Sequence, residues 1–269
     1  MQNISEIAES YIESHDISAG HARALRSHAA NYAAEFSAAA LNAHLRALRQ
    51  LGRSDTHIRN RRVYVLMLWR FAASRDLLPD PPLSKIMRVR VRDLVVRGYQ
   101  PDQVAALKES ASLLRGRYKS GVERAEWWRS YISAAWDTGL STCDLLDVRR
   151  EWIGVDGEFT TVRRKTGKRV VVGLHSTTLT EIDATFPPER ELIWPLTVSR
   201  EMMRRTFAKL ARLAGCGGTL KWLRAGSGTS VDERHGHGEW HLGNTRQVFE
   251  RHYLCHSLRA RLPAEIPTR

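Results

Sequence analysis

The chain reads Lys221-Trp222-Leu223-Arg224, then His241-Leu242-Gly243-Asn244, and then Arg251-His252-Tyr253. This order predicts a lysine and an arginine one helical turn apart, followed by a Leu-Gly turn and by a tyrosine that closes a short helical run. A tyrosine held beside fixed cations suits attack on a phosphodiester, because the phenol must lose its proton while negative charge builds on phosphorus. The pattern therefore indicates a polyanionic substrate.

Composition supports such a partner. Lys and Arg total 42 against 29 Asp and Glu, which gives a formal net charge of +13. An excess of this size favours a polyanion such as nucleic acid, whereas a basic but otherwise ordinary protein is the alternative. The length of 269 residues, of which 42% are hydrophobic, predicts two domains with apolar cores.

Cysteine usage and apolar runs indicate the compartment. Cys143, Cys216 and Cys255 show no paired spacing, which suits a reducing cytosol. The first residues lack the basic and apolar regions of a signal peptide. The longest apolar run, Val63–Trp69, is far shorter than the roughly 20 residues of a membrane span. We therefore expect a cytoplasmic protein with no membrane partner.

Residues 1–84 show helical periodicity throughout. Ser37 and Ser54 are expected to cap two of the helices, and the proline-rich run at residues 79–82 ends the last one. Any four-helix bundle has the same periodicity, so the pattern leaves the type of bundle open. In residues 85–98, basic and apolar side chains alternate. This segment is either a solvated basic strand or a linker that follows a phosphate backbone.

A larger domain is expected from Pro101, which suits the first position of a helix. Further helices are predicted, and the β-like runs 159–163 and 169–174 are expected to form a hairpin with a basic tip at Lys165–Lys168. The glycine-rich stretch 226–238 is expected to be a mobile loop. The predicted fold class is mainly α with a small antiparallel β-sheet.

The three stretches quoted first resemble the tyrosine recombinase (phage integrase) family. Its hallmark segments are His-x-x-Arg, Leu-Gly-His, and a tyrosine nine residues beyond that histidine; here Asn244 has the histidine's place and Tyr253 follows at that distance. The resemblance covers nearly the whole chain. It implies a helical core-binding (SAM-like) DNA-binding domain over 1–84, a basic linker over 85–98 and a catalytic domain over 99–269, which together clamp duplex DNA.

The resemblance also implies roles for individual residues. Tyr253 would be the nucleophile that forms a 3′-phosphotyrosyl link, and Arg224 would hold non-bridging phosphate oxygens. Lys221 replaces a histidine and keeps a cation at the site. Asn244 replaces another histidine; its amide still donates a hydrogen bond, but it cannot transfer protons near neutral pH. Lys165 matches the hairpin lysine that protonates the leaving 5′ oxygen, with Lys168 in reserve.

One position departs from the family pattern. Residues 137–146 resemble the Thr-Gly-Leu-Arg box, in which the first catalytic arginine would stand at position 141, but this chain has Ser141. Serine offers one neutral hydrogen bond instead of a charged fork. Loss of one such donor typically slows a reaction by roughly 10²–10³. Four nearby arginines are candidates to replace it, and the sequence does not choose among them: Arg149, Arg150, Arg163 and Arg164.

The resemblance implies a site-specific recombinase of a mobile genetic element that uses no metal, no nucleotide cofactor and no small-molecule substrate, and that works as a homo-oligomer (a tetramer) on double-stranded DNA. The expected DNA contacts are Arg59, Arg61, Arg62, Arg88, Arg90, Arg92 and Lys168. A catalytically impaired relative that serves as a DNA-binding accessory or regulatory protein is the alternative.

Two further features remain open. Histidines cluster near the C-terminal end and suggest a metal site as a third class of function, although their spacing does not fit structural zinc; the residues are His235, His237, His241, His256 and Cys255. Leu254, Leu258 and Leu262 recur every four residues beyond Tyr253. Such a stripe would pack on a neighbouring protomer or on the chain's own core.

Overall fold

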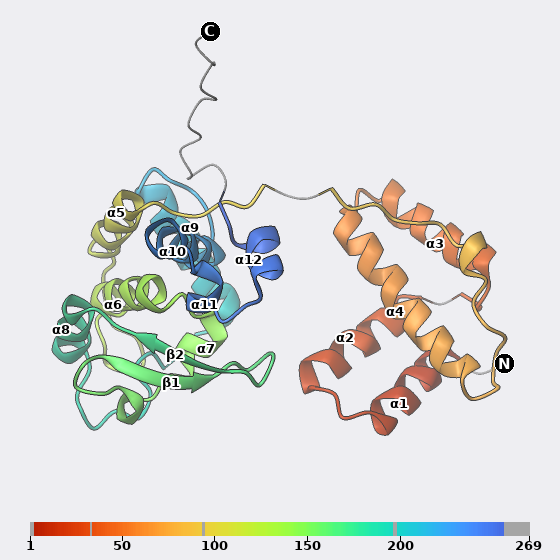
Figure 1. Ribbon diagram of the computed structural model, residues 1–269, viewed down its shortest axis with the longest axis horizontal. Helices are drawn as coiled ribbons and strands as arrows, with labels where there is room; N and C mark the ends of the chain where they lie inside the picture. Colours follow the sequence, from red (N-terminus) through yellow and green to blue (C-terminus); the bar gives the residue numbers. More distant parts are fainter. Residues whose placement is uncertain (1–2, 33, 93–94, 196–197, 256–269) are drawn as a thin grey trace, which may run out of the picture. The chain divides into compact units, whose positions relative to one another are not determined.

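The computed structural model describes residues 3–32, 34–92, 95–195 and 198–255 (Figure 1). The chain divides into two compact units, Met1–Asp93 and Leu94–Arg269, called here the N-terminal unit and the C-terminal unit. The described residues are mostly helical and contain one two-stranded antiparallel sheet. The predicted fold class is therefore confirmed. Among these residues, none of the helices combines the length and hydropathy of a membrane span.

Helices packed around an apolar core make up the N-terminal unit, drawn in red to orange in Figure 1. They are α1 (Ile4–Ser14), α2 (Ala19–Ala30), α3 (Ala38–Gln50) and α4 (Asp55–Ala73). Ser18, Ser37 and Ser54 precede α2, α3 and α4, and each hydroxyl oxygen accepts a hydrogen bond from a backbone N–H of the first turn. The two serine caps predicted from the sequence are among them.

The segment after α4 is fixed to this unit as an extended chain. It begins with the short 3-10 helix η1 (Leu83–Lys85). The side chain of Asn42 forms two hydrogen bonds with the backbone of this segment. Its Nδ2 donates to Lys85 O at 2.9 Å, and its Oδ1 accepts from Met87 N at 2.8 Å. Ile86 is buried against the helices. No β-strand forms over the described residues 86–92, and a role of this segment as a linker along a phosphate backbone stays a prediction.

The C-terminal unit carries the remaining elements (Figure 1). Helices α6 and α10 lie at its centre, and a large aromatic and aliphatic core surrounds α6. In chain order the elements are α5 (Pro101–Ala111), α6 (Arg124–Thr138), α7 (Thr142–Leu146), η2 (Arg150–Trp152), β1 (Glu158–Val162), β2 (Arg169–Gly173), α8 (Ser176–Thr185), α9 (Arg200–Leu213), α10 (Leu220–His235), α11 (Gly238–His241) and α12 (Arg246–His252).

The predicted hairpin is present as β1 and β2. The strands pair in register from Glu158 opposite Gly173 to Val162 opposite Arg169. Alternate residues are buried, so one face packs on the core and the other faces solvent. At the tip, Arg163 closes the turn: its N–H donates to Lys168 O at 2.9 Å, and its carbonyl oxygen accepts from Gly167 N at 2.8 Å.

The expectation of a mobile loop over residues 226–238 is wrong, because α10 runs through Leu220–His235. Gly226 and Gly228 lie inside this helix, where close neighbours explain the missing side chains. A Cβ at Gly226 would lie 2.2 Å from the backbone oxygen of Tyr99. A Cβ at Gly228 would lie 2.7 Å from a methyl group of Leu242. The glycines therefore allow close packing along α10 instead of marking a loop.

Candidate functional site

The side chains of Tyr253, Arg224 and Lys221 meet at one place, as the sequence pattern predicts. Tyr253 is half-buried directly after α12, whereas Arg224 and Lys221 project from the first turns of α10. The guanidinium carbon of Arg224 lies 4.9 Å from the centroid of the Tyr253 ring, and Lys221 Nζ lies 5.6 Å from it. All three side chains line a cavity of about 610 Å³.

Arg224 is fixed by backbone carbonyls from two other segments. Its Nη1 donates to the oxygen of Gly139, and its Nη2 donates to Leu242 O at 2.8 Å. Gly139 ends α6 in a left-handed conformation, with φ at 56°. Arg224 is buried, and within the described residues its Nε has no hydrogen-bond partner. The guanidinium thus keeps an unsatisfied buried donor.

The electrostatic surroundings of Arg224 include a second guanidinium. Burial lowers the pKa of Arg224, and the charge of Arg163 lowers it further. The charge of Tyr253, a hydrogen bond with its side chain, and the charge of Asp144 act in the opposite direction on this pKa. Tyr253 and Asp144 thus favour the charged form of the buried arginine.

Ser141 lines the same cavity but has a structural task. It is the N-cap of α7: its hydroxyl donates to Asp144 Oδ2 at 2.7 Å, and its oxygen accepts from Asp144 N at 3.4 Å. Asp144 is buried and also accepts a hydrogen bond from Arg164 N at 3.0 Å. The hydroxyl proton of Ser141 is thus committed to a carboxylate.

Asn244 is joined to the hairpin by Arg163. The Nη1 of Arg163 donates to Gly243 O and to Asn244 Oδ1, each at 3.2 Å. These bonds fix the orientation of the Asn244 amide. Its Nδ2 is buried and has no hydrogen-bond partner among the described residues. A second buried donor is therefore unsatisfied in this part of the unit.

The two hairpin lysines are exposed. Lys165 lies in the turn between β1 and β2, and Lys168 directly precedes β2. The neighbouring Gly243 is packed on the hairpin, since a Cβ there would lie 2.5 Å from a methyl group of Val170. The hairpin thus contacts the turn that carries Asn244. The role of Lys165 as an acid stays a prediction.

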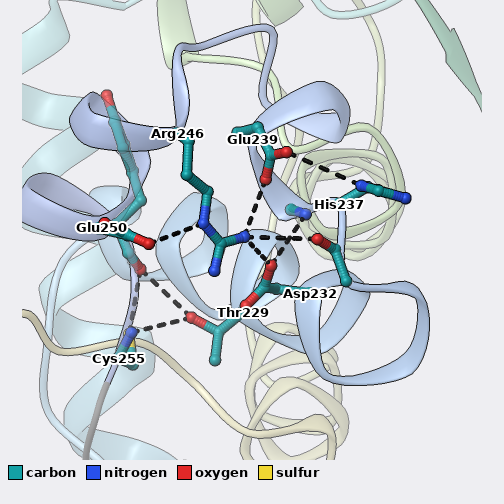
Figure 2. A network of polar contacts seen from close by, with 10 residues as sticks. Thr229, Asp232, His237, Glu239, Arg246, Glu250 and Cys255 are labelled. Carbon is teal, nitrogen blue, oxygen red and sulfur yellow. Dashed lines mark hydrogen bonds and ion pairs between the residues drawn. The ribbon is translucent and has the colours of Figure 1, made fainter.

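A network of ion pairs fixes α12, the helix that ends at Tyr253 (Figure 2). Arg246 of α12 donates from Nη1 to Asp232 Oδ1 at 2.5 Å and to Glu239 Oε2 at 3.0 Å. Its Nε donates to Glu250 Oε1 at 2.8 Å. These hydrogen bonds, above all the one to Asp232, raise the pKa of Arg246. The network joins α12 to both α10 and α11.

Thr229 holds the backbone around Tyr253. Its hydroxyl donates to Tyr253 O at 3.2 Å and accepts from Cys255 N at 3.0 Å (Figure 2). The sequence pattern did not single out Thr229, Arg246 or Asp232. The pair Arg246 and Glu250, four residues apart on a short helix, was the only signal present, and such pairs are common on helix surfaces.

Two histidines of the suggested metal site, His237 and His241, have other contacts. Among the described residues, no group of three or more His, Cys, Asp and Glu side chains is placed to hold a metal ion, and His256 lies outside the described residues. His241 Nε2 lies 2.7 Å from Ser227 Oγ, and burial lowers the pKa of His241 to about 4. His237 stacks on Trp240 at 4.0 Å between ring centroids.

The arginines expected to contact DNA are not all accessible. Arg61 is 5% exposed, and its Nη1 donates to His28 O at 2.8 Å within the N-terminal unit. The guanidinium is thus engaged in the packing of this unit, and its contact with DNA stays an untested prediction. Arg62 is half-buried and donates from Nε to Met87 O at 2.9 Å, whereas Arg59 is exposed on α4.

Residues 86–92 form a basic arm with alternating accessibility. Arg88, Arg90 and Arg92 are exposed, and Val89 and Val91 between them are half-buried. Val89 packs against the apolar core of the N-terminal unit. The arm therefore presents its cations to solvent along a fixed extended backbone, and their contact with DNA stays a prediction. Of the C-terminal leucine stripe, Leu254 is buried, and Leu258 and Leu262 lie outside the described residues.

Solved structures of DNA-bound integrases and recombinases share this fold. A lambda integrase dimer bound to a COC′ core site matches with a TM-score of 0.74 and 14% identity, over 97% of this chain and 98% of that chain. The Tn1549 transposon integrase in complex with a circular intermediate DNA matches with a TM-score of 0.68 and 10% identity, over 95% and 96%.

The XerH site-specific recombinase, bound to a palindromic difH substrate in a post-cleavage complex, matches with a TM-score of 0.67 and 12% identity. The match covers 93% of this chain and 79% of that chain. The sequence matches no protein-family model and no curated protein. The chain thus has the fold of the tyrosine recombinases, and the resemblance stated from the sequence is confirmed at the level of the fold.

Proposed function

We propose that this chain is a tyrosine-type site-specific DNA recombinase that clamps duplex DNA, cleaves it with Tyr253 and rejoins it. The observation that carries the proposal is the guanidinium of Arg224, which is buried against the ring of Tyr253 at 4.9 Å. A fixed cation beside a phenol stabilises the negative charge that builds on phosphorus during attack.

In the proposed reaction, the Tyr253 oxygen bonds to the scissile phosphorus and the phenolic proton leaves to solvent. The bond from phosphorus to the 5′ oxygen breaks, and that oxygen takes a proton from Lys165. Attack by a 5′ hydroxyl on the phosphotyrosyl link reverses these bond changes and rejoins the strand. Arg224, Lys221 and Asn244 would bind the phosphate oxygens, and no step requires a metal or a nucleotide.

The proposed assembly follows the same comparisons. Lambda integrase was solved as a dimer on a core site and as a tetramer on a Holliday junction. We propose that this chain also acts as a homo-oligomer, a tetramer, on double-stranded DNA. The N-terminal unit and the basic arm would bind the duplex, in a cytoplasmic protein of a mobile genetic element.

A second function has one observation in its favour. Position 141 carries a serine whose hydroxyl proton is committed to Asp144, so the site lacks a cation there. A relative that kept the DNA-binding fold and lost cleavage, and that serves as an accessory or regulatory protein, is therefore the alternative proposal.

A nicked suicide duplex distinguishes the two functions. The DNA is taken from the flanks of the gene, and the nick lets the freed 5′ fragment diffuse away, so that the covalent protein–DNA link accumulates. We expect an adduct that resists denaturing electrophoresis with the unaltered chain and no adduct with Tyr253→Phe, while both proteins retard the duplex equally. Tight binding without any adduct from the unaltered chain would support the accessory protein instead.

A further inference from the structure

Four arginines are candidates to supply the positive charge that Ser141 lacks. Three of them form ion pairs with carboxylates. Arg149 pairs with Glu191, Arg150 pairs with Asp183, and Arg164 Nη1 lies 3.6 Å from Asp147 Oδ2. Arg163 forms no ion pair with a described residue, although it is only 8% exposed. A buried guanidinium without a carboxylate partner is uncommon, because desolvation of the charge is costly.

From the proposed function we infer that Arg163 is a further catalytic residue, which supplies to the scissile phosphate the second guanidinium that Ser141 cannot provide. This inference rests on the proposed recombinase reaction. It assigns to the end of β1 a task that the family pattern assigns to the Thr-Gly-Leu-Arg box.

The hairpin fixes Arg163 firmly. Its backbone closes the turn through bonds to Lys168 O, Thr166 N and Gly167 N. Its side chain is anchored by Nη1 alone, which donates to Gly243 O and Asn244 Oδ1 at 3.2 Å. Among the described residues no hydrogen bond engages Nη2 or Nε of Arg163, so this edge of the guanidinium is available to bind an anion in the charged fork typical of arginine.

The charges and donors around Arg163 favour an anionic ligand. The guanidinium of Arg224 donates to Leu242 O and that of Arg163 donates to the next carbonyl, Gly243 O, so two buried guanidinium groups lie near each other. Asp144 is the carboxylate that also acts on Arg224, and it accepts hydrogen bonds from Ser141 and from the backbone of Arg164. Asp144 thus acts on Arg224, whereas the guanidinium of Arg163 forms no ion pair with a described residue and its charge is not directly compensated there.

Two buried donors without partners lie among these same residues. They are Arg224 Nε and Asn244 Nδ2. Buried donors without acceptors are costly, and an incoming acceptor removes that cost. A phosphodiester carries one negative charge and two non-bridging oxygens, so it would neutralise the excess charge and accept from these donors. The alternative is that Arg163 only orients Asn244, and rates of covalent adduct formation separate the two roles.

The test compares Arg163→Met with Arg164→Met on the suicide duplex, at protein concentrations that saturate the DNA. Arg164 is the matched control because it is the adjacent residue, its side chain is exposed, and its backbone contact with Asp144 survives substitution. We expect Arg163→Met to slow adduct formation by about 10²–10³-fold and Arg164→Met to change it by less than about 3-fold. Arg163→Lys, which keeps the charge but not the fork, should give an intermediate rate.

A second substrate separates charge neutralisation from positioning. A methylphosphonate at the scissile position replaces one charged oxygen with a methyl group. If Arg163 neutralises that oxygen, then the ratio of variant to unaltered rate rises towards one on this substrate. A lower folded fraction would reduce both rates of a variant equally, so the comparison of ratios also holds for a destabilised variant.

Three results of these experiments would overturn the inference about Arg163. An equal loss on both substrates means that Arg163 only positions Asn244 or the hairpin, and it overturns the inference. An adduct with the unaltered chain and an undiminished rate for Arg163→Met also overturns the inference, while the proposed function stands. No adduct with the unaltered chain overturns the proposed function, and the inference falls with it.

Discussion

Arg246 Nη1 lies 2.5 Å from Asp232 Oδ1, and this contact joins the helix that ends at Tyr253 to the helix that carries Arg224. The Asp232 side chain is 0% exposed, whereas Arg246 is 40% exposed. The buried carboxylate of Asp232 therefore depends on the hydrogen bond from Arg246 for its stability, whereas the exposed arginine can also be solvated. Tyr253, the proposed nucleophile, and Arg224, the proposed phosphate ligand, are thus held on helices that this ion pair joins.

We expect Arg246→Met to lower the free energy of unfolding of the C-terminal unit by about 1.5–3 kcal/mol, because it removes a charged hydrogen bond from a buried carboxylate. Glu250→Gln is the control, since it removes only the exposed pair of the same arginine and should cost less than about 1 kcal/mol. Urea unfolding followed by tryptophan fluorescence measures both, since every tryptophan except Trp69 lies in this unit. Equal effects of the two substitutions would contradict the assignment.

Stability should fall in acid because two partly buried histidines favour the neutral form. Burial is the largest cause that lowers the pKa of His28 and of His241 to about 4, helped by Arg61 and Arg224 respectively. An unfolded histidine titrates near pH 6.5, so between pH 6.5 and 4 the unfolded chain binds more protons. This contribution to stability is complete above about pH 6.5 and is lost as the pH falls towards 4.

The measurement for this prediction is the urea midpoint of the C-terminal unit at pH 7.5, 6 and 5. His241→Gln should flatten the dependence on pH, whereas the exposed His235→Gln should leave it unchanged. The prediction fails if the midpoint of His241→Gln falls with pH as steeply as that of the unaltered chain.

The exposed arginines of the basic arm should set the salt dependence of DNA binding. Removal of one phosphate-binding cation reduces the slope of log K against log salt by about 0.9, so Arg88→Ala, Arg90→Ala and Arg92→Ala together should reduce it by about 2–3. Arg26→Ala is a control from the same unit, because its guanidinium pairs with Glu9 at 2.7 Å. Titration of labelled duplex at several salt concentrations gives the slopes, and an unchanged slope for the triple variant would exclude the arm from the interface.

Gly226→Ala should destabilise the C-terminal unit, because the added Cβ would lie 2.2 Å from the backbone oxygen of Tyr99. Overpacking of this kind typically costs about 1–3 kcal/mol. The control is Gly20→Ala at the start of α2, where the nearest atom to a new Cβ is 4.0 Å away. There the change should be neutral or stabilising, by up to about 1 kcal/mol. Urea unfolding of the two units tests both, and an undiminished midpoint for Gly226→Ala would show that α10 is not packed against Tyr99.

Local signals in the sequence predicted much of this fold. Ser37 and Ser54 cap their helices as expected, and the hairpin forms around Lys165–Lys168, because caps and turns depend on a few neighbouring residues. The meeting of Arg224 and Tyr253 was also predicted, since the pattern of residues 221–253 is short. The loop expected at Gly226 is a helix instead. The glycine is required there by close contact with Tyr99, which is distant in the sequence, so local signals could not reveal it.

The same limit applies to the site. Arg163 and Asn244 are separated by 81 positions, so the alternation that puts Arg163 on the same face as Phe159 does not reveal their contact. Arg61 likewise is buried and Arg59 is exposed, although the two arginines lie only two positions apart on the same helix. Choices among similar basic residues depend on tertiary packing, which periodicity and composition do not encode.

The most direct test of the proposed chemistry is the identity of the residue that carries DNA in the trapped adduct. Trypsin digestion of the suicide-duplex adduct should release residues 252–259, His-Tyr-Leu-Cys-His-Ser-Leu-Arg, joined to a nucleotide through Tyr253. Mass spectrometry of this peptide locates the modified side chain. We predict a phosphotyrosyl link at Tyr253 and none in Tyr253→Phe; a link through any other residue, or no adduct at all, would contradict the proposal.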